Sequence, residues 1–203
     1  MKKLFLASKS PRRKAILEKA GIKFSIINSD YDEELNDKNF SYEKIETLAK
    51  NKAFGALNNI KEASFVLSAD TVVVLDNHIL TKPTDFDDAL NILKSLSNKE
   101  HQVVTSLCLL DFETQKYILK STTTKVEFNY LTEKMITNYI DNYKPFDKAG
   151  AYGIQELPAG FVKQVKGDKE NVIGLSSKSV ITAIRQLEIL LPESQEKSAC
   201  LQD

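Results

Sequence analysis

The chain has 203 residues, which is enough for one domain with a substantial hydrophobic core. Its 28 lysines and arginines balance its 28 aspartates and glutamates, and this zero net charge argues against a general nucleic-acid binder or a membrane-surface binder. The two cysteines lie far apart and suggest no disulfide framework. The sequence shows neither an apolar run of the roughly 20 residues that a bilayer requires nor a signal peptide. These features favour a reducing cytoplasm.

The first segment predicts a strand, a tight turn and the start of a helix. An apolar run at residues 4–6 leads to Ser8 and Ser10, and Ser10 is a good helix N-cap. Pro11 follows at the first helical position, where proline is favoured. The helix should extend over residues 11–20.

The start of this helix carries clustered positive charge. Free backbone N–H groups at a helix N-terminus attract anions, and Lys9, Arg12 and Arg13 add charge and forked donors that suit phosphate oxygens. Paired arginines also occur simply on a solvated helix face. The serine hydroxyls beside them favour binding of a phosphorylated ligand.

Strand-like and helix-like segments alternate along the rest of the chain, which favours a mixed α/β domain. The expected strands cover residues 24–27, 65–75, 79–80, 102–111, 116–130 and 161–165. The expected helices cover residues 41–57, 84–96, 132–143 and 176–191. Asp76 and Asn77 should form a hairpin turn, and Thr84 should cap the helix that follows.

Asp70 lies within the strongly apolar strand at residues 65–75. A buried carboxylate is costly unless it is paired or binds a cation. At the end of that strand it would face a cleft, where carboxylates often hold a metal or act as a base. A polar strand end is the plainer alternative, and we prefer the functional one.

Three other segments each allow two interpretations. The acidic loop that contains Glu33 could face solvent, or it could supply oxygen ligands to Mg²⁺ or Mn²⁺. Lys82 could be an ordinary loop lysine or could neutralise a phosphate. The small residues within 147–155 could form a structural turn or allow a ligand close to the backbone, with the Gln155 amide reading a nucleobase.

Several common motifs are missing from the sequence. It contains no G-x-x-x-x-G-K-[ST] phosphate loop, no G-x-G-x-x-G and no G-x-S-x-G. Its two histidines, His78 and His101, make a Cys/His zinc site improbable.

Taken together, these segments resemble the Maf family of nucleoside triphosphate pyrophosphatases. The matching pieces follow the family's order: residues 6–8 with 10–13, 69–72, 82–83, 101–105, 147–155 and 171–176. The resemblance implies an elongated α/β mixed-sheet fold, similar to that of inosine triphosphate pyrophosphatases, with two lobes around a deep cleft. We expect one such domain over residues 1–191, with a weak lobe boundary near residues 80–84, and a polar tail over residues 192–203.

The resemblance also implies an activity, which is hydrolysis of a nucleoside triphosphate to the monophosphate and pyrophosphate with a divalent metal, Mg²⁺ or Mn²⁺. Asp70 matches the family's proton acceptor, and Glu33 matches an acidic position at the metal site beside it. Lys52 and Lys82 match lysines that face the phosphates, and Ser8, Ser10 and Arg13 should bind the phosphate chain with them.

Base choice is implied by three further positions, because Arg12, Thr71 and Gln155 resemble the branch that acts on dTTP and UTP. Modified pyrimidine nucleotides are further candidate substrates in a nucleotide-pool cleaning role, and a cytoplasmic homodimer is implied. The chain departs from the family in having Ser176 in place of a proline and Glu156 in place of a glycine beside Gln155. A non-catalytic nucleotide-binding regulator of cell division is the alternative function.

Overall fold

The computed structural model describes residues 2–31 and 37–191. Its strands are β1 (Lys3–Leu6), β2 (Ser25–Ile26), β3 (Ser64–Leu75), β4 (His78–Leu80), β5 (Glu100–Asp111), β6 (Tyr117–Phe128) and β7 (Val162–Lys166). Its α-helices are α1 (Pro11–Lys19), α2 (Tyr42–Phe54), α3 (Phe86–Leu96), α4 (Glu133–Tyr143), α5 (Lys169–Ile173) and α6 (Ser177–Leu190). Its 3-10 helices are η1 (Leu57–Asn59), η2 (Pro145–Asp147) and η3 (Ala149–Ala151). None of these described helices is long and apolar enough to cross a membrane.

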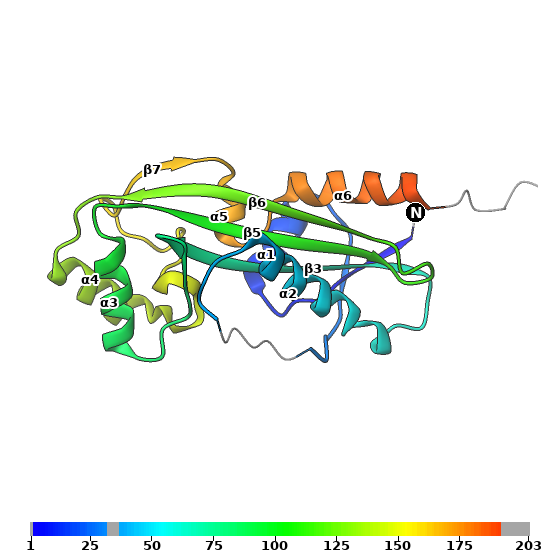
Figure 1. Ribbon diagram of the computed structural model, residues 1–203, viewed down its shortest axis with the longest axis horizontal. Coiled ribbons are helices and arrows are strands. Elements are labelled where there is room, and N and C mark those ends of the chain that lie inside the picture. The colour runs from blue at the N-terminus through cyan, green and yellow to red at the C-terminus, as the bar shows by residue number, and fades with distance from the viewer. Residues whose placement is uncertain (1, 32–36, 192–203) are drawn as a thin grey trace, which may run out of the picture.

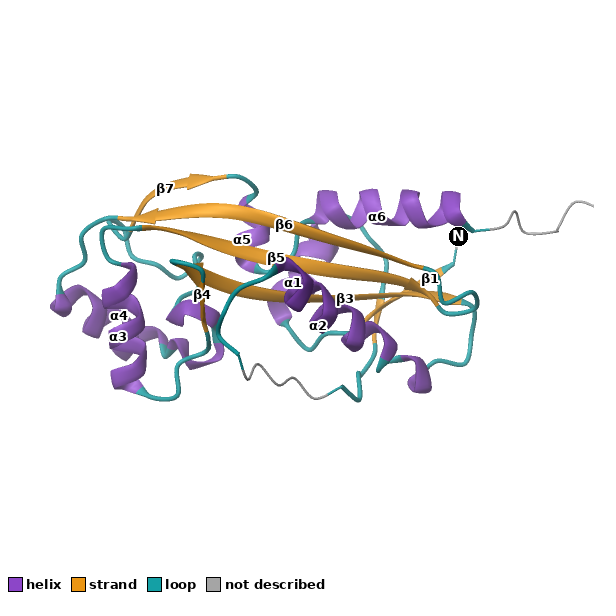
Figure 2. Ribbon diagram, viewed as in Figure 1, coloured by secondary structure: helices purple, strands orange, loops and turns teal. Residues whose placement is uncertain are grey.

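The described strands form one mixed sheet, which confirms the α/β class. The order is β2-β1-β3-β5-β6-β7, and β4 pairs with β3. β1 runs parallel to β2 and β3, whereas β3, β5, β6 and β7 pair antiparallel in succession. The three long strands β3, β5 and β6 run along the long axis of the molecule, with α3 and α4 at one end and α6 toward the other (Figure 1). The sheet is therefore the central layer on which the helices pack (Figure 2).

Alternate residues of β3 face opposite sides of the sheet. Phe65 and Leu67 belong to a core cluster that also contains residues of α1 and α6. Val66 belongs to a different cluster, which contains Ala49 and Ala53 of α2. Even-numbered residues of β3 thus face α2, and odd-numbered residues face the side of α1 and α6.

Most of the described α-helices begin at a side chain that accepts a backbone N–H. Ser41, Thr132 and Ser176 cap α2, α4 and α6 in this way. The predicted cap of α3 was wrong by one residue, because Asp85 rather than Thr84 accepts the hydrogen bond from the Asp88 amide. A carboxylate at this place also interacts favourably with the helix dipole.

The edge of β3 is open midway along the strand. β1 pairs with β3 only as far as Leu67, and β4 pairs with it only from Val73. Among the described strands, residues 68–72 therefore have a neighbour only on the β5 side. Asp70 thus lies in the interior of β3 and not at its end, which corrects the expectation from the sequence. It reaches open space because its neighbouring strand stops.

Candidate active site

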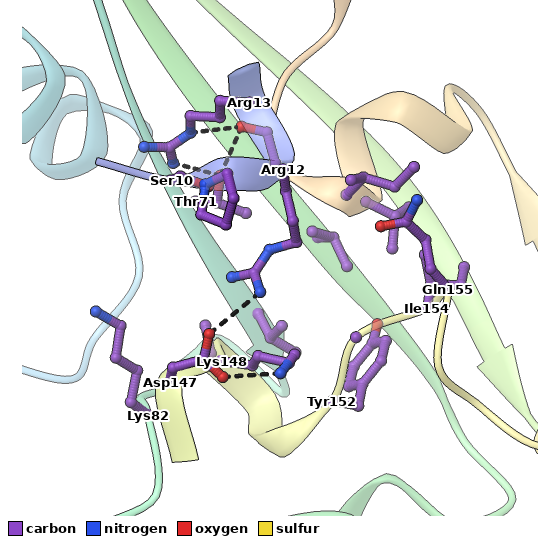
Figure 3. A pocket seen from close by; sticks show the side chains of 18 of the residues that line it. Ser10, Arg12, Arg13, Thr71, Lys82, Asp147, Lys148, Tyr152, Ile154 and Gln155 are labelled. Atoms are coloured by element: carbon purple, nitrogen blue, oxygen red, sulfur yellow. Dashed lines mark hydrogen bonds and ion pairs between the residues drawn. The ribbon is translucent and has the colours of Figure 1, made fainter. Parts of the chain in front are cut away.

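A pocket of about 460 Å³ lies at this open edge, between the start of α1 and the η2–η3 segment (Figure 3). It is lined by every candidate site residue that the structure describes: Ser8, Ser10, Arg12, Arg13, Lys52, Asp70, Thr71, Lys82 and Gln155. Candidate residues as far apart in the sequence as Ser8 and Gln155 therefore share one cavity. Glu33, the expected metal ligand, lies outside the described residues.

Asp70 and Lys52 form an ion pair at the pocket. Lys52 Nζ lies 2.7 Å from Asp70 Oδ1, and each residue is only 7% exposed. The two meet because Asp70 is an even-numbered residue of β3 and faces α2, which carries Lys52 beside its buried apolar residues. A buried carboxylate and a buried ammonium tolerate burial best as a pair.

Arg13 is held in place by three groups from different parts of the fold. Its guanidinium donates to the Gly174 carbonyl (2.9 Å), the Thr71 hydroxyl (3.1 Å) and the Ser8 hydroxyl (3.2 Å). Thr71 Oγ1 also lies 2.9 Å from Thr105 Oγ1. This network fixes the Arg13 side chain at the start of α1, which is where the sequence predicts an anion site.

Ser10 occupies the N-cap position of α1, but its side chain makes no capping hydrogen bond. Its backbone N–H instead donates to Ser8 Oγ at 3.2 Å. Proline at the start of α1 has no N–H to satisfy. The Ser8–Ser10 turn therefore shapes the wall of the pocket, and the Ser10 hydroxyl is not used to cap the helix.

Arg12, Asp147 and Lys148 form a chain of charges along one side of the pocket (Figure 3). Arg12 Nη1 donates to Asp147 Oδ2 at 3.2 Å, and Lys148 Nζ donates to Asp147 Oδ1 at 2.8 Å. Partial burial of Asp147 raises its pKa, but the hydrogen bonds and charges of these two cations outweigh it and lower the pKa below the usual value. The Asp147 carboxylate is thus stabilised as an anion between two cations.

The remaining charges of the pocket favour a polyanionic ligand. Six of its described lining side chains are basic: Lys9, Arg12, Arg13, Lys52, Lys82 and Lys148. Three are acidic: Asp70, Asp147 and Glu156. Lys82 and Gln155 are exposed at its margin, where they have room to meet a ligand. A cleft lined mainly by one sign of charge concentrates ligands of the opposite sign.

Aromatic packing supports one wall of the pocket. Tyr152 lines it, and its buried hydroxyl lies 2.7 Å from Nε2 of His101 on β5. Burial lowers the pKa of His101 from 6.5 to about 4, and the charge of Glu100 opposes this shift only weakly. His101 is therefore a neutral core residue.

The described residues offer limited protein ligation for a divalent metal. No group of three or more His, Cys, Asp or Glu side chains gathers among them in a way that could hold an ion. Asp70, however, is a hard oxygen donor at a pocket rich in basic side chains. Mg²⁺ is commonly bound by one or two carboxylates together with substrate phosphates, and this donor set is compatible with that arrangement.

Sequence reasoning missed Lys148 and Tyr152 as individual lining residues, although both belong to the motif at residues 147–155. It also missed Gly174, whose carbonyl holds Arg13. The motif itself was the signal for the first two. Gly174 lies within the matching piece at residues 171–176, but the contact of its carbonyl with Arg13 depends on the fold.

Comparison with known families and curated proteins gives a consistent result. The model of a family described as Maf-like protein matches residues 3–187. The dTTP/UTP pyrophosphatase of Clostridium perfringens (strain 13 / Type A) is 40% identical over 190 residues, which cover 93% of this chain and 99% of that protein. The dTTP/UTP pyrophosphatase of Alkaliphilus oremlandii (strain OhILAs) is 42% identical over 175 residues, which cover 86% of this chain and 91% of that protein.

Solved structures give weaker matches. A nucleoside-triphosphatase / dITP/XTP pyrophosphatase from Mycobacterium abscessus aligns with a TM-score of 0.43 and 14% identity, over 94% of this chain and 98% of that one. A HAM1 protein from Coxiella burnetii aligns with a TM-score of 0.44 and 15% identity, over 96% of this chain and 100% of that one.

Proposed function

The chain belongs to the Maf family, and we propose that it hydrolyses dTTP and UTP to the nucleoside monophosphate and pyrophosphate. The coarser activity is that of a nucleoside triphosphate pyrophosphatase, the activity named for relatives about 40% identical over most of this chain. One observation supports the finer proposal most: a single pocket joins a buried aspartate to six basic side chains and to Gln155.

Asp70 is proposed as the proton acceptor. A water molecule in line with the α-phosphorus would lose its proton to the Asp70 carboxylate as it attacks, and pyrophosphate would leave on the opposite side. Lys52, 2.7 Å from Asp70 Oδ1, orients the carboxylate for this task. Its ammonium also adds positive charge beside the phosphates, where negative charge increases in the transition state.

The phosphate chain is proposed to lie along the start of α1. Arg13, fixed by Ser8, Thr71 and the Gly174 carbonyl, presents its guanidinium to the same cavity as Lys82. A cation that is already held in place loses little entropy when the phosphates arrive. Ser8 and Ser10 complete this wall of the pocket.

We propose that Asp70 and Glu33 would hold Mg²⁺ or Mn²⁺ together with phosphate oxygens. Such an ion, when bound, polarises a phosphoryl oxygen and neutralises the leaving pyrophosphate. Arg12, Thr71 and Gln155 are proposed to select the base. Modified pyrimidine triphosphates as substrates, a homodimer and a cytoplasmic location remain predictions from the sequence.

The test is release of pyrophosphate from a panel of nucleoside triphosphates with Mg²⁺, with Mn²⁺ and with a chelator. We expect turnover of dTTP and UTP above the other bases, lost in the chelator, with pyrophosphate rather than orthophosphate as product. Preference for a purine would contradict the base assignment. Metal-dependent binding of triphosphates without any turnover would instead favour the non-catalytic regulator.

A further inference from the structure

Lys148 is a buried cation held between two carboxylates. It is only 8% exposed, and it stands between η2 and η3. Its Nζ lies 2.8 Å from Asp147 Oδ1 and 3.2 Å from Glu156 Oε2. An ammonium at such depth requires anionic partners, and these two are supplied from opposite ends of the same loop.

Each carboxylate adjoins a residue proposed to select the base. Asp147 accepts a hydrogen bond from Arg12 through its other oxygen, at 3.2 Å. Glu156 directly follows Gln155, and its Oε2 is buried with no described hydrogen-bond donor, so its described electrostatic partner is Lys148. Lys148 is therefore the shared centre of a line of charges that runs from Arg12 to the segment carrying Gln155.

The loop between the two acids closes tightly around the Lys148 side chain. A Cβ placed on Gly153 would lie 3.0 Å from Lys148 Cε and 3.1 Å from Glu156 Oε2. Both distances are tighter than ordinary van der Waals contact. Glycine lets the backbone lie this close to the Lys148 and Glu156 side chains without displacing them, so the loop packs directly on this ion pair.

We propose that Lys148 is a positioning residue for base selection, because it fixes Arg12 and Gln155 relative to each other through Asp147 and Glu156. This inference rests on the proposed function, in which Arg12 and Gln155 face the base. Without the ammonium, the Asp147 and Glu156 carboxylates lose the cation that both of them contact. Their repulsion would open the loop and move Gln155 away from Arg12.

The experiment compares kcat/KM for dTTP and dCTP in Lys148→Met and Glu156→Gln. These substrates share the sugar, the phosphates and the ring size, and differ chiefly at the base edge. We expect the dTTP/dCTP ratio to fall about tenfold in Lys148→Met, the scale of one charged hydrogen bond, with KM for dTTP changing more than kcat. Methionine keeps the apolar stem that packs on Gly153.

The matched control is Lys163→Met. It removes a lysine from an exposed ion pair with Glu127, outside the pocket, and should leave the dTTP/dCTP ratio unchanged.

A second variant and a double variant distinguish loss of base selection from misfolding. The Glu156 side chain is 38% exposed, so Glu156→Gln should fold and should lower the ratio in the same direction. The double variant should lose no more than Lys148→Met alone, because both changes break one bridge. Equal losses for dTTP and dCTP would overturn the inference and indicate that Lys148 binds phosphate directly.

The wild-type protein in the same assay separates the two proposals. A wild-type preference for dTTP that both variants retain would overturn the role of Lys148 and leave the proposed function intact. A wild-type protein without a preference for dTTP would overturn both, since no base selection would exist for Lys148 to support.

Discussion

The Lys52 ammonium and the Asp70 carboxylate lie 2.7 Å apart, and this pair joins α2 to β3 beneath the pocket. The same contact therefore belongs to the core packing and to the candidate chemistry. Ile45 and Leu48 bury the same face of α2 against Val72 and Val74 of β3. The apolar packing fixes where the helix lies, and the ion pair fixes where the carboxylate points.

Replacing Lys52 with methionine should lower both stability and turnover. The variant leaves Asp70 buried beside an apolar side chain, which typically costs about 3 kcal/mol of unfolding free energy when one partner of a buried pair is removed. Urea unfolding measures this cost. The matched control is Lys50→Met on the same helix, which removes an exposed contact with Tyr117 and should cost less than about 1 kcal/mol. Equal losses of unfolding free energy in the two variants would show that the buried ion pair contributes no more to stability than the exposed contact.

Two glycines with the same backbone conformation should respond differently to alanine. Gly150 and Gly21 have φ of +68° and +69°, so both variants are strained by about 1 kcal/mol. At Gly150 the new Cβ would lie 2.8 Å from Val73 Cγ2, whereas nothing lies within 4 Å of it at Gly21. We expect Gly150→Ala to lose about 1–3 kcal/mol more in urea unfolding, because Val73 is packed in the core. Equal losses would contradict the close packing of η3 on β3.

His101 should make the protein less stable as the pH falls. Burial lowers the pKa of His101 to about 4 in the folded protein, while the unfolded chain titrates near 6.5. Between these values the unfolded state binds more protons, so the stability due to neutral His101 is complete above pH 6.5 and is lost as the pH falls toward 4. The full loss is about 3 kcal/mol.

The measurement for His101 is urea unfolding near pH 7 and near pH 4.5, in the wild type and in His101→Gln. Glutamine stays neutral and can still bond to the Tyr152 hydroxyl. The wild type should lose more stability than the variant across this interval. If both lose the same amount, His101 is not the group whose protonation is linked to unfolding.

Much of the fold follows from local signals in the sequence. Nearly continuous apolar stretches, rich in β-branched residues, predict β3 and β5. The Asp76–Asn77 turn is confirmed by φ values of 49° and 65°, as a tight hairpin requires. Serine, proline and arginine at the start of α1 also predict an anion site, and the structure brings these residues into one pocket with Asp70.

What could not be predicted depends on long-range packing. The place where β1 stops opposite Leu67 decides that Asp70 faces open space, and no local pattern encodes the pairing of these strands. The short helix α5 has five residues, too few for a hydrophobic period, yet it places the Gly174 carbonyl on Arg13. Lys148 resembles an exposed loop lysine in sequence, and only its two carboxylate partners reveal that it is buried.

The most direct measurement is pyrophosphate release from dTTP by Asp70→Asn, at the same metal concentration and pH as the wild type. The substitution keeps the shape of the side chain and removes its capacity to accept a proton, so turnover per folded molecule should fall by at least ~10²-fold. Asp111→Asn is the control, because Asp111 is also buried and ion-paired, with Lys2, but lies outside the pocket. It should retain turnover. Turnover retained by folded Asp70→Asn would contradict the assignment of this pocket as the site of triphosphate hydrolysis through Asp70.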